Sequence, residues 1–168
     1  MGAGQAAGSP RPPALHTPRA GARTPALPFL PMSTTVSDVA TGVLMTAADG
    51  HVVLRVPGTN YMIRLACVAD ERDLAPHVGR RVRGIVHAKA LKMNHAAGGG
   101  VFIEPVDGHP RIVQGRVIAT DIQRNRVLAD VVVPMWLEVA PGQAASDFAT
   151  GQLLNFYVQS GATFTPVA

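Results

Sequence analysis

In two runs of the sequence every second residue is apolar. In residues 80–91 the apolar set is Val82, Gly84, Val86, Ala88 and Ala90, and the residues between them are Arg81, Arg83, Ile85, His87 and Lys89. Because successive side chains of a strand point to opposite faces, this pattern predicts a strand with one buried face and one basic, solvent-exposed face. Residues 153–159 predict a second such strand, which buries Leu154, Phe156 and Val158 and carries no charge on its outer face.

The other apolar runs are short, and their order occurs twice along the chain. Each half begins with a glycine one residue into a β-rich run, Gly42 or Gly115. In both halves the same parts then follow in the same order. They are a turn, an apolar run followed by a proline, a third strand, a polar connection that ends in glycine, and one of the alternating strands. Each half closes on a strand with a phenylalanine, VFIEPV or ATFTPV. This self-similarity predicts two copies of one unit, joined near His109 and Pro110.

Five short strands in each copy, with a connection between the third and fourth, are typical of a five-stranded Greek-key barrel. On this strand order and glycine placement each copy resembles an OB-fold, although the resemblance rests on no signature motif. The fold class we predict is all-β, with two tandem five-stranded OB-like antiparallel barrels over residues 38–109 and 110–168. A single two-sheet sandwich is the alternative architecture.

Residues 1–31 have a different composition, with seven prolines and no apolar period of either 2 or 3.6. Such a segment buries too little apolar surface to offset the entropy of ordering it, so we expect a disordered tail. An arginine-rich electrostatic arm and an acid-poor organellar transit peptide are the functional alternatives. A further interpretation is that translation starts at Met32, where a polar segment leads directly into the first strand.

The charge of the chain is unevenly distributed. Three of its 15 Lys and Arg residues lie in residues 1–31, which contain no acidic residue. The segment from Met32 onward contains the other 12 basic residues and all 11 acidic residues. The segment after the tail is therefore nearly neutral, so the calculated pI of about 10.0 is no evidence of a basic globular body.

Two observations bear on location. The single cysteine, Cys67, cannot form a disulfide within the chain, and we expect it to be buried in a strand as a small hydrophobe. No apolar run approaches the ~18 residues of a membrane span, and LPFLPM is too short and proline-broken for a secretory signal. We therefore expect a cytoplasmic protein with no membrane partner.

The sequence contains no recognisable motif for catalysis or for cofactor binding. Neither GxGxxG nor GxxxxGK[ST] occurs, no nucleophile elbow is present, and the six histidines lack HxxxH or HExxH spacing. A lone cysteine also excludes a cysteine-based zinc site. We expect no enzyme, no cofactor and no metal. An enzyme or small-ligand binder would need a deep pocket with convergent polar groups, which we would seek at the junction near GHPRIV.

The resemblance to OB-folds implies binding of an oligonucleotide or an oligosaccharide on the face of strands two and three and through the loops after strands one and four. The candidate residues for nucleic acid in the first copy are Arg81, Arg83, His87, Lys89, Lys92, Asn94, His95 and Tyr61. Lys92, Asn94 and His95 belong to the stretch KMNHAAGGG, which we expect to be a mobile loop, and Tyr61 is a candidate stacking platform. An ordinary solvated strand face is the alternative, favoured by an aromatic content of only 5%.

Two functions therefore compete. The first is weak, non-enzymatic binding of single-stranded nucleic acid through the first barrel. The second is a protein–protein interaction or assembly module, including self-association, through exposed strand edges or the apolar parts of the second copy. Trp136 and Tyr157 are its candidate interaction or packing residues, and a lone tryptophan is often an anchor in a core or between barrels.

Overall fold

The computed structural model describes residues 35–168, together with residues 4, 8–10 and 13. The predicted disorder of residues 1–31 and the alternative start at Met32 concern a segment that, except for residues 4, 8–10 and 13, lies outside the described residues. Residues 35–168 belong to a single compact unit by their contacts.

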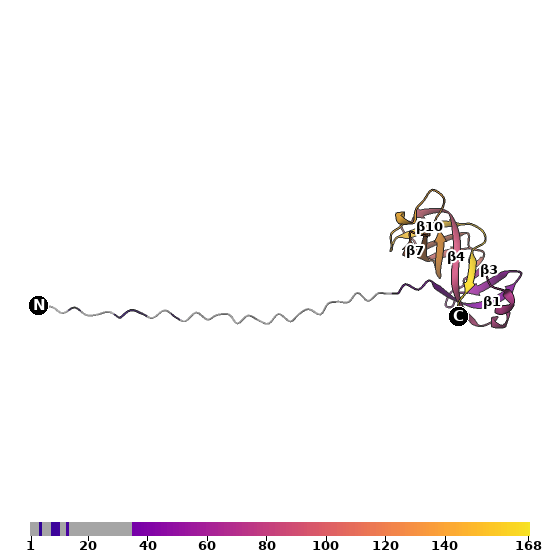
Figure 1. The fold of residues 1–168 in the computed structure, drawn as a ribbon, viewed down its shortest axis with the longest axis horizontal. Coiled ribbons are helices and arrows are strands. Elements are labelled where there is room, and N and C mark those ends of the chain that lie inside the picture. The colour runs from indigo at the N-terminus through magenta and orange to yellow at the C-terminus, as the bar shows by residue number, and fades with distance from the viewer. Residues whose placement is uncertain (1–3, 5–7, 11–12, 14–34) are drawn as a thin grey trace. The chain divides into compact units, whose positions relative to one another are not determined.

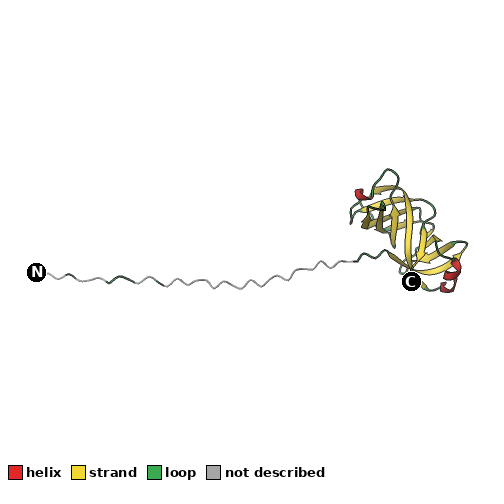
Figure 2. Cartoon of the chain, viewed as in Figure 1, coloured by secondary structure: helices red, strands yellow, loops and turns green. Residues whose placement is uncertain are grey.

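The described chain is an all-β protein, which confirms the predicted class, and almost all of its regular secondary structure is strand (Figure 2). The strands are β1 (Val39–Ala48), β2 (His51–Arg55), β3 (Met62–Cys67), β4 (Arg81–His95), β5 (Phe102–Glu104), β6 (Asp107–Gly108), β7 (Ile112–Asp121), β8 (Arg126–Asp130), β9 (Pro134–Glu138), β10 (Leu153–Val158) and β11 (Thr163–Pro166). The helical segments are α1 (Glu71–Leu74) and the 3-10 turns η1 (Ala75–His77) and η2 (Ala145–Asp147). None of the helices described is long and apolar enough to cross a membrane.

All the strands belong to one sheet, whose pairings close into two circuits that share β4. Figure 1 shows β4 extending from beside β7 and β10 toward β1 and β3. In the first circuit β1 pairs with β2, β2 with β3, β3 with β11, β11 with β4, and β4 again with β1. In the second, β4 pairs with β10, β10 with β7, β7 with β8, β8 with β9, and β9 again with β4. The two circuits are therefore joined along one strand.

The length of β4 explains how it serves both circuits. Its buried residues alternate from Val82 to Ala90 and continue at Met93, so an apolar face extends along a strand of 15 residues. The first part of β4 pairs with β1 and β11, and the last part pairs with β10. The predicted assignment of faces is confirmed here and on β10, where Leu154, Phe156 and Val158 are buried.

Three pairings are parallel, namely β3 with β11, β3 with β6 and β4 with β9. The prediction of purely antiparallel barrels is therefore wrong on this point, and the sheet is mixed. Parallel neighbours cannot be joined by a tight hairpin and need a longer connection. Both β9 and β11 reach strands of the first half of the chain from far along the sequence, so strand pairing crosses the expected boundary between His109 and Pro110.

Local signals account for the hairpins. Asp49 and Gly50 connect β1 to β2 with φ values of 55° and 72°, the left-handed pair that a tight two-residue turn between twisted strands requires. Asn125 has the same kind of backbone, φ 49°, in the turn before β8. The buried apolar side chains form one cluster that runs through both circuits, from Leu44 and Leu65 to Phe156 and Phe164.

Candidate functional site

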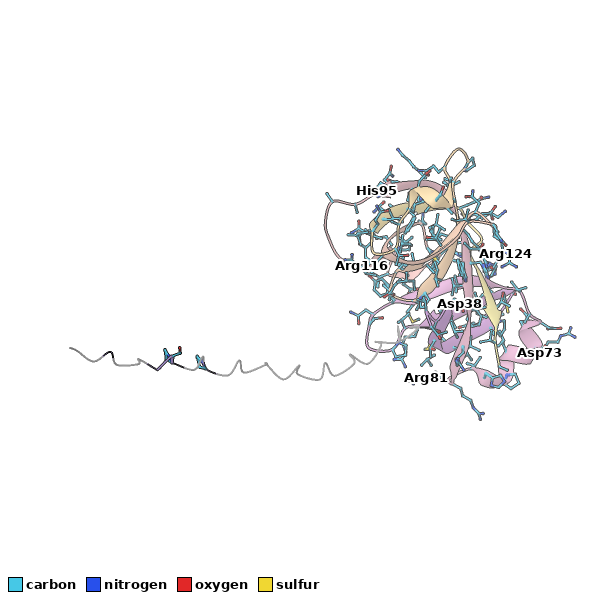
Figure 3. All side chains as sticks on the ribbon, turned by 60° about the vertical axis from the view of Figure 1, so that its left-hand side comes forward. Asp38, Asp73, Arg81, His95, Arg116 and Arg124 are labelled. Carbon is cyan, nitrogen blue, oxygen red and sulfur yellow. The ribbon has the colours of Figure 1, made fainter. Side chains whose placement is uncertain are left out.

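The candidate nucleic-acid residues on β4 do not form one site. Arg81 and His95 are the two ends of a 15-residue strand, which at ~3.3 Å per residue places them roughly 45 Å apart along its path. Figure 3 shows His95 near the upper end and Arg81 near the lower end of the folded part of the chain. Each group along β4 therefore has its own surroundings.

Four exposed arginines gather on the outer face of the first circuit, and we call this set the arginine face: Arg55, Arg64, Arg81 and Arg83. Val43 of β1 lies between two of them, because it pairs with Arg55 on one side and with Arg81 on the other. Since neighbouring strands are ~4.8 Å apart, those two side chains start about 10 Å from each other.

The other two members extend the arginine face in both directions. Arg83 follows Arg81 two residues along β4 and pairs with Thr41. Arg64 of β3 lies two residues from Met62, the partner of Arg55, so it is a diagonal neighbour of Arg55 at ~7–8 Å. All four therefore lie within reach of one extended ligand.

No strand of the first circuit contains an Asp or Glu, although Asp38 and Asp49 flank β1. None of the four arginines forms an ion pair with another side chain of residues 35–168. Asp73 lines a pocket of about 540 Å³ beside Arg81 and Arg83 without such a bond. Carboxylates lie at its edges, because Asp107 of β6 pairs with Met62 beside Arg64, and Asp49 lines a pocket with Arg64. The arginine face is thus a group of four cations without ion-pair partners among the described residues, bordered by acidic residues.

Tyr61 is less available for stacking than the sequence led us to expect. It precedes β3, is half-buried and packs against the core cluster. Its hydroxyl oxygen accepts a long hydrogen bond, 3.4 Å, from the backbone N–H of Ile103 on β5. The side chain is therefore tied to its own fold, and its role as a platform stays a prediction.

His87 and Lys89 lie farther along β4, in a separate pocket of about 350 Å³ that also contains Trp136. We call it the Trp136 pocket. The cations of this pocket have carboxylate partners: Lys89 Nζ lies 3.6 Å from Glu138 Oε2, and Arg126 Nε lies 3.1 Å from Asp121 Oδ2. It therefore offers an anion much less free charge than the arginine face does.

Trp136 itself is held within the molecule. Its indole N–H donates to Asp38 Oδ2 at 3.0 Å, and the guanidinium carbon of Arg126 lies 4.0 Å from its ring centroid. Asp38 precedes β1 of the first circuit and Trp136 belongs to β9 of the second, so the pair links the two circuits.

Two titrating groups of this region have shifted pKa values. Partial burial lowers the pKa of His87, Arg126 lowers it further, and Asp38 opposes the shift. The backbone N–H of Arg124, with Arg126 and the Arg124 side chain, holds the pKa of Asp121 below its usual value. The lowered pKa favours the charged form of Asp121, which forms ion pairs with Arg124 and Arg126.

Lys92, Asn94 and His95 do not lie in a mobile loop, which corrects the expectation for that stretch. They continue β4, and each pairs with a residue of β10. The glycines that follow are held by the buried side chain of Gln114, whose Nε2 donates to the carbonyls of Gly98 at 3.2 Å and of Gly100 at 2.9 Å.

Tyr157 lies on an apolar groove of about 590 Å³ on the second circuit. The apolar groove is lined by Leu91, Pro105, Ile112, Tyr157, Glu104 and Arg111, with Val158 at its base. Leu91 is 59% exposed and Tyr157 47%, which is unusual for large apolar side chains on neighbouring strands. Of the two predicted interaction residues, Tyr157 therefore faces solvent, whereas Trp136 is anchored.

Sequence reasoning missed Arg55 and Arg64. Both had a usable signal, because each is an outward residue with a buried apolar residue on either side: Arg64 lies within β3, and Arg55 ends β2 between Leu54 and Val56. Each of their strands contains a single arginine, whereas β4 contains several basic residues, so only β4 stood out as a basic strand in the sequence. In the described part of the chain no group of three or more His, Cys, Asp or Glu side chains is arranged to hold a metal ion.

Comparison of the sequence with protein-family models and with curated protein sequences gives no match.

Proposed function

We propose that the two circuits are OB-like barrels and that the chain is a non-enzymatic protein that binds single-stranded nucleic acid weakly through the arginine face. The observation that carries the proposal is the set of four exposed, unpaired arginines on acid-free strands of the described chain. A phosphate backbone is the polyanion that such a surface attracts, and counterion release supplies the free energy of binding.

The position of the arginine face supports the same proposal. Arg55 and Arg64 belong to β2 and β3, the second and third strands of the first circuit, where OB-folds bind oligonucleotides. Guanidinium planes can also stack on unpaired bases, which compensates for the scarcity of free aromatic rings. Without such rings the affinity should be low and should depend little on base sequence.

The test is a salt titration of binding between the full chain and a labelled oligothymidylate, followed by fluorescence anisotropy. Each phosphate contact to a single strand contributes about 0.7 to the slope of log K against log salt. We expect the double variant Arg55→Gln/Arg81→Gln to reduce that slope by about 1.4 and to weaken binding at low salt.

The matched control is Arg72→Gln/Arg116→Gln, which removes the same charge from exposed positions outside the arginine face. It should leave the slope close to that of the unmodified chain. Equal losses in the two double variants would show that binding follows net charge alone. Absence of binding by the unmodified chain at low salt would refute the proposed function.

A second candidate function, protein–protein interaction, is favoured by one specific observation. The apolar groove leaves Leu91 and Tyr157 exposed side by side with Ile112 and Pro105. Contiguous exposed apolar surface with polar residues at its rim marks interaction sites on proteins. The apolar groove and the arginine face share no residue, so the two functions can be tested separately.

A further inference from the structure

We propose that the apolar groove is the interface of a homodimer, in which two copies of the chain pack face to face across a two-fold axis. The proposal rests on the second candidate function and names its partner. The occupant we infer is a second copy of this chain. The rim of the apolar groove carries one acidic and one basic residue, so the rim of one copy can pair with the rim of another.

The rim of the apolar groove carries one residue of each sign, Glu104 from the end of β5 and Arg111 just before β7. The two are close in the fold, since the backbone N–H of Arg111 donates to the Glu104 carbonyl at 2.8 Å. Neither side chain forms an ion pair with any other described side chain. Both charges are therefore free to meet charges of a partner.

A two-fold interface brings the same patch of both copies together, so that a residue i contacts j of the partner while j contacts i. Glu104 of each copy can then lie opposite Arg111 of the other, which gives two equivalent ion pairs. A strongly acidic or basic partner would instead find one complementary and one repelling charge at this rim.

The floor of the apolar groove suits such an interface. Tyr157 is an aromatic residue with a polar tip, a type enriched at the centres of interfaces, and it lies beside Leu91 on the adjoining strand β4. Burial of these two side chains supplies the apolar contact, and the Glu104 and Arg111 pairs select the orientation. Because the patch is small, we expect a dimer that dissociates on dilution.

The test uses reversal of each rim charge in the full chain, with mass measured by light scattering and sedimentation over a wide range of concentration. Glu104→Arg makes both rim positions basic, and Arg111→Glu makes both acidic. Each variant alone should dimerise about tenfold or more weakly than the unmodified chain, because its own copies repel.

An equimolar mixture of the two variants distinguishes a specific interface from damage to the fold. In the mixed dimer every rim position faces the opposite charge, so dimerisation should return to the level of the unmodified chain. Tyr157→Ser should weaken dimerisation and should not be rescued by mixing. Arg72→Glu, an exposed charge reversal outside the apolar groove, is the control and should leave the dimer unchanged.

Three results would overturn the proposal: a monomer at every concentration, dimers that the single reversals leave unchanged, or a mixture that does not recover. Binding of oligothymidylate by the same variants gives an independent readout, because the arginine face is intact in all of them. Loss of dimerisation with retained binding of oligothymidylate would contradict neither the nucleic-acid proposal nor its site. Dimerisation without binding of oligothymidylate would refute the nucleic-acid proposal and leave the dimer proposal intact.

Discussion

Phe164 on β11 covers Gly84 on β4 so closely that a Cβ atom at position 84 would overlap the Phe164 ring and the carbonyl oxygen of Thr165. Phe164 is fully buried, and the pairing of β11 with β4 places Pro166 directly opposite Gly84. The last strand of the chain is thereby seated in the first circuit. The closure of that circuit depends on the absence of a side chain at one position.

We expect Gly84→Ala to destabilise the protein by about 1–3 kcal/mol, because the buried Phe164 ring must leave its position. Urea unfolding followed by circular dichroism measures the change. Phe164→Leu in the same chain should recover part of the loss, since a smaller side chain leaves room for the methyl group. Gly98→Ala is the control, because an added Cβ there meets nothing within 4 Å, and an equal loss in both variants would contradict the explanation.

Gln114 should determine the mobility of the glycine segment after β4. Gln114→Leu removes the two bonds to the Gly98 and Gly100 carbonyls and the bond that Asn155 donates to Gln114 Oε1. We expect a loss of about 1–2 kcal/mol and faster amide hydrogen exchange across residues 96–101. Asn155→Ala removes only the bond between Asn155 and Gln114, so amide exchange across residues 96–101 should stay close to that of the unmodified chain. Unchanged exchange in Gln114→Leu would be inconsistent with this role.

The bond between Trp136 and Asp38 should be visible in the fluorescence of the only tryptophan. Asp38→Ala removes the acceptor of the indole N–H and should destabilise the fold by about 1 kcal/mol while shifting the emission of Trp136. Asp38→Asn keeps an oxygen acceptor and should behave more like the unmodified chain. Identical spectra and stabilities for all three proteins would show that the bond does not link the circuits.

His87 should make the fold less stable in mild acid. Its pKa in the folded state is lowered, chiefly by burial and then by Arg126, so the unfolded chain binds the proton more readily below pH 6.5. Stability is therefore complete above the unfolded pKa and falls as the pH drops from that value through the folded pKa. Unfolding in urea at pH 7.5 and pH 5.5 should give a smaller difference in His87→Gln than in the unmodified chain.

The remaining histidines are common to both proteins in that comparison and cancel in the difference. A variant with the same dependence on pH as the unmodified chain would mean that His87 does not contribute.

Much of the strand arrangement could be predicted from local patterns. The alternation around Val82 and Val86, and around Leu154 and Phe156, correctly assigned the inner and outer faces of β4 and β10. Alternation is a local property, because each residue points to the face opposite its neighbour whatever strand lies beside it. The Asp49 and Gly50 turn was equally local, since only a few residue types tolerate its backbone.

The candidate site was predicted only in part, for the same reason. Arg81 and Arg83 share a strand and were recognised together, whereas Arg55 and Arg64 join them only because β2 and β3 pair with each other and β1 bridges Arg55 to Arg81. Lys92, Asn94 and His95 were misplaced, because the glycines that follow them suggested a loop before the strand had ended.

The sequence by itself determined the all-β class, the faces of the alternating strands and the turns between hairpin strands, since these depend on residues close together in the chain. Only the tertiary structure decided which strands meet: that β4 serves two circuits, that β11 lies between β3 and β4, and that β9 runs parallel to β4. Those choices depend on how distant side chains pack, as Phe164 does over Gly84, and no local pattern records such contacts.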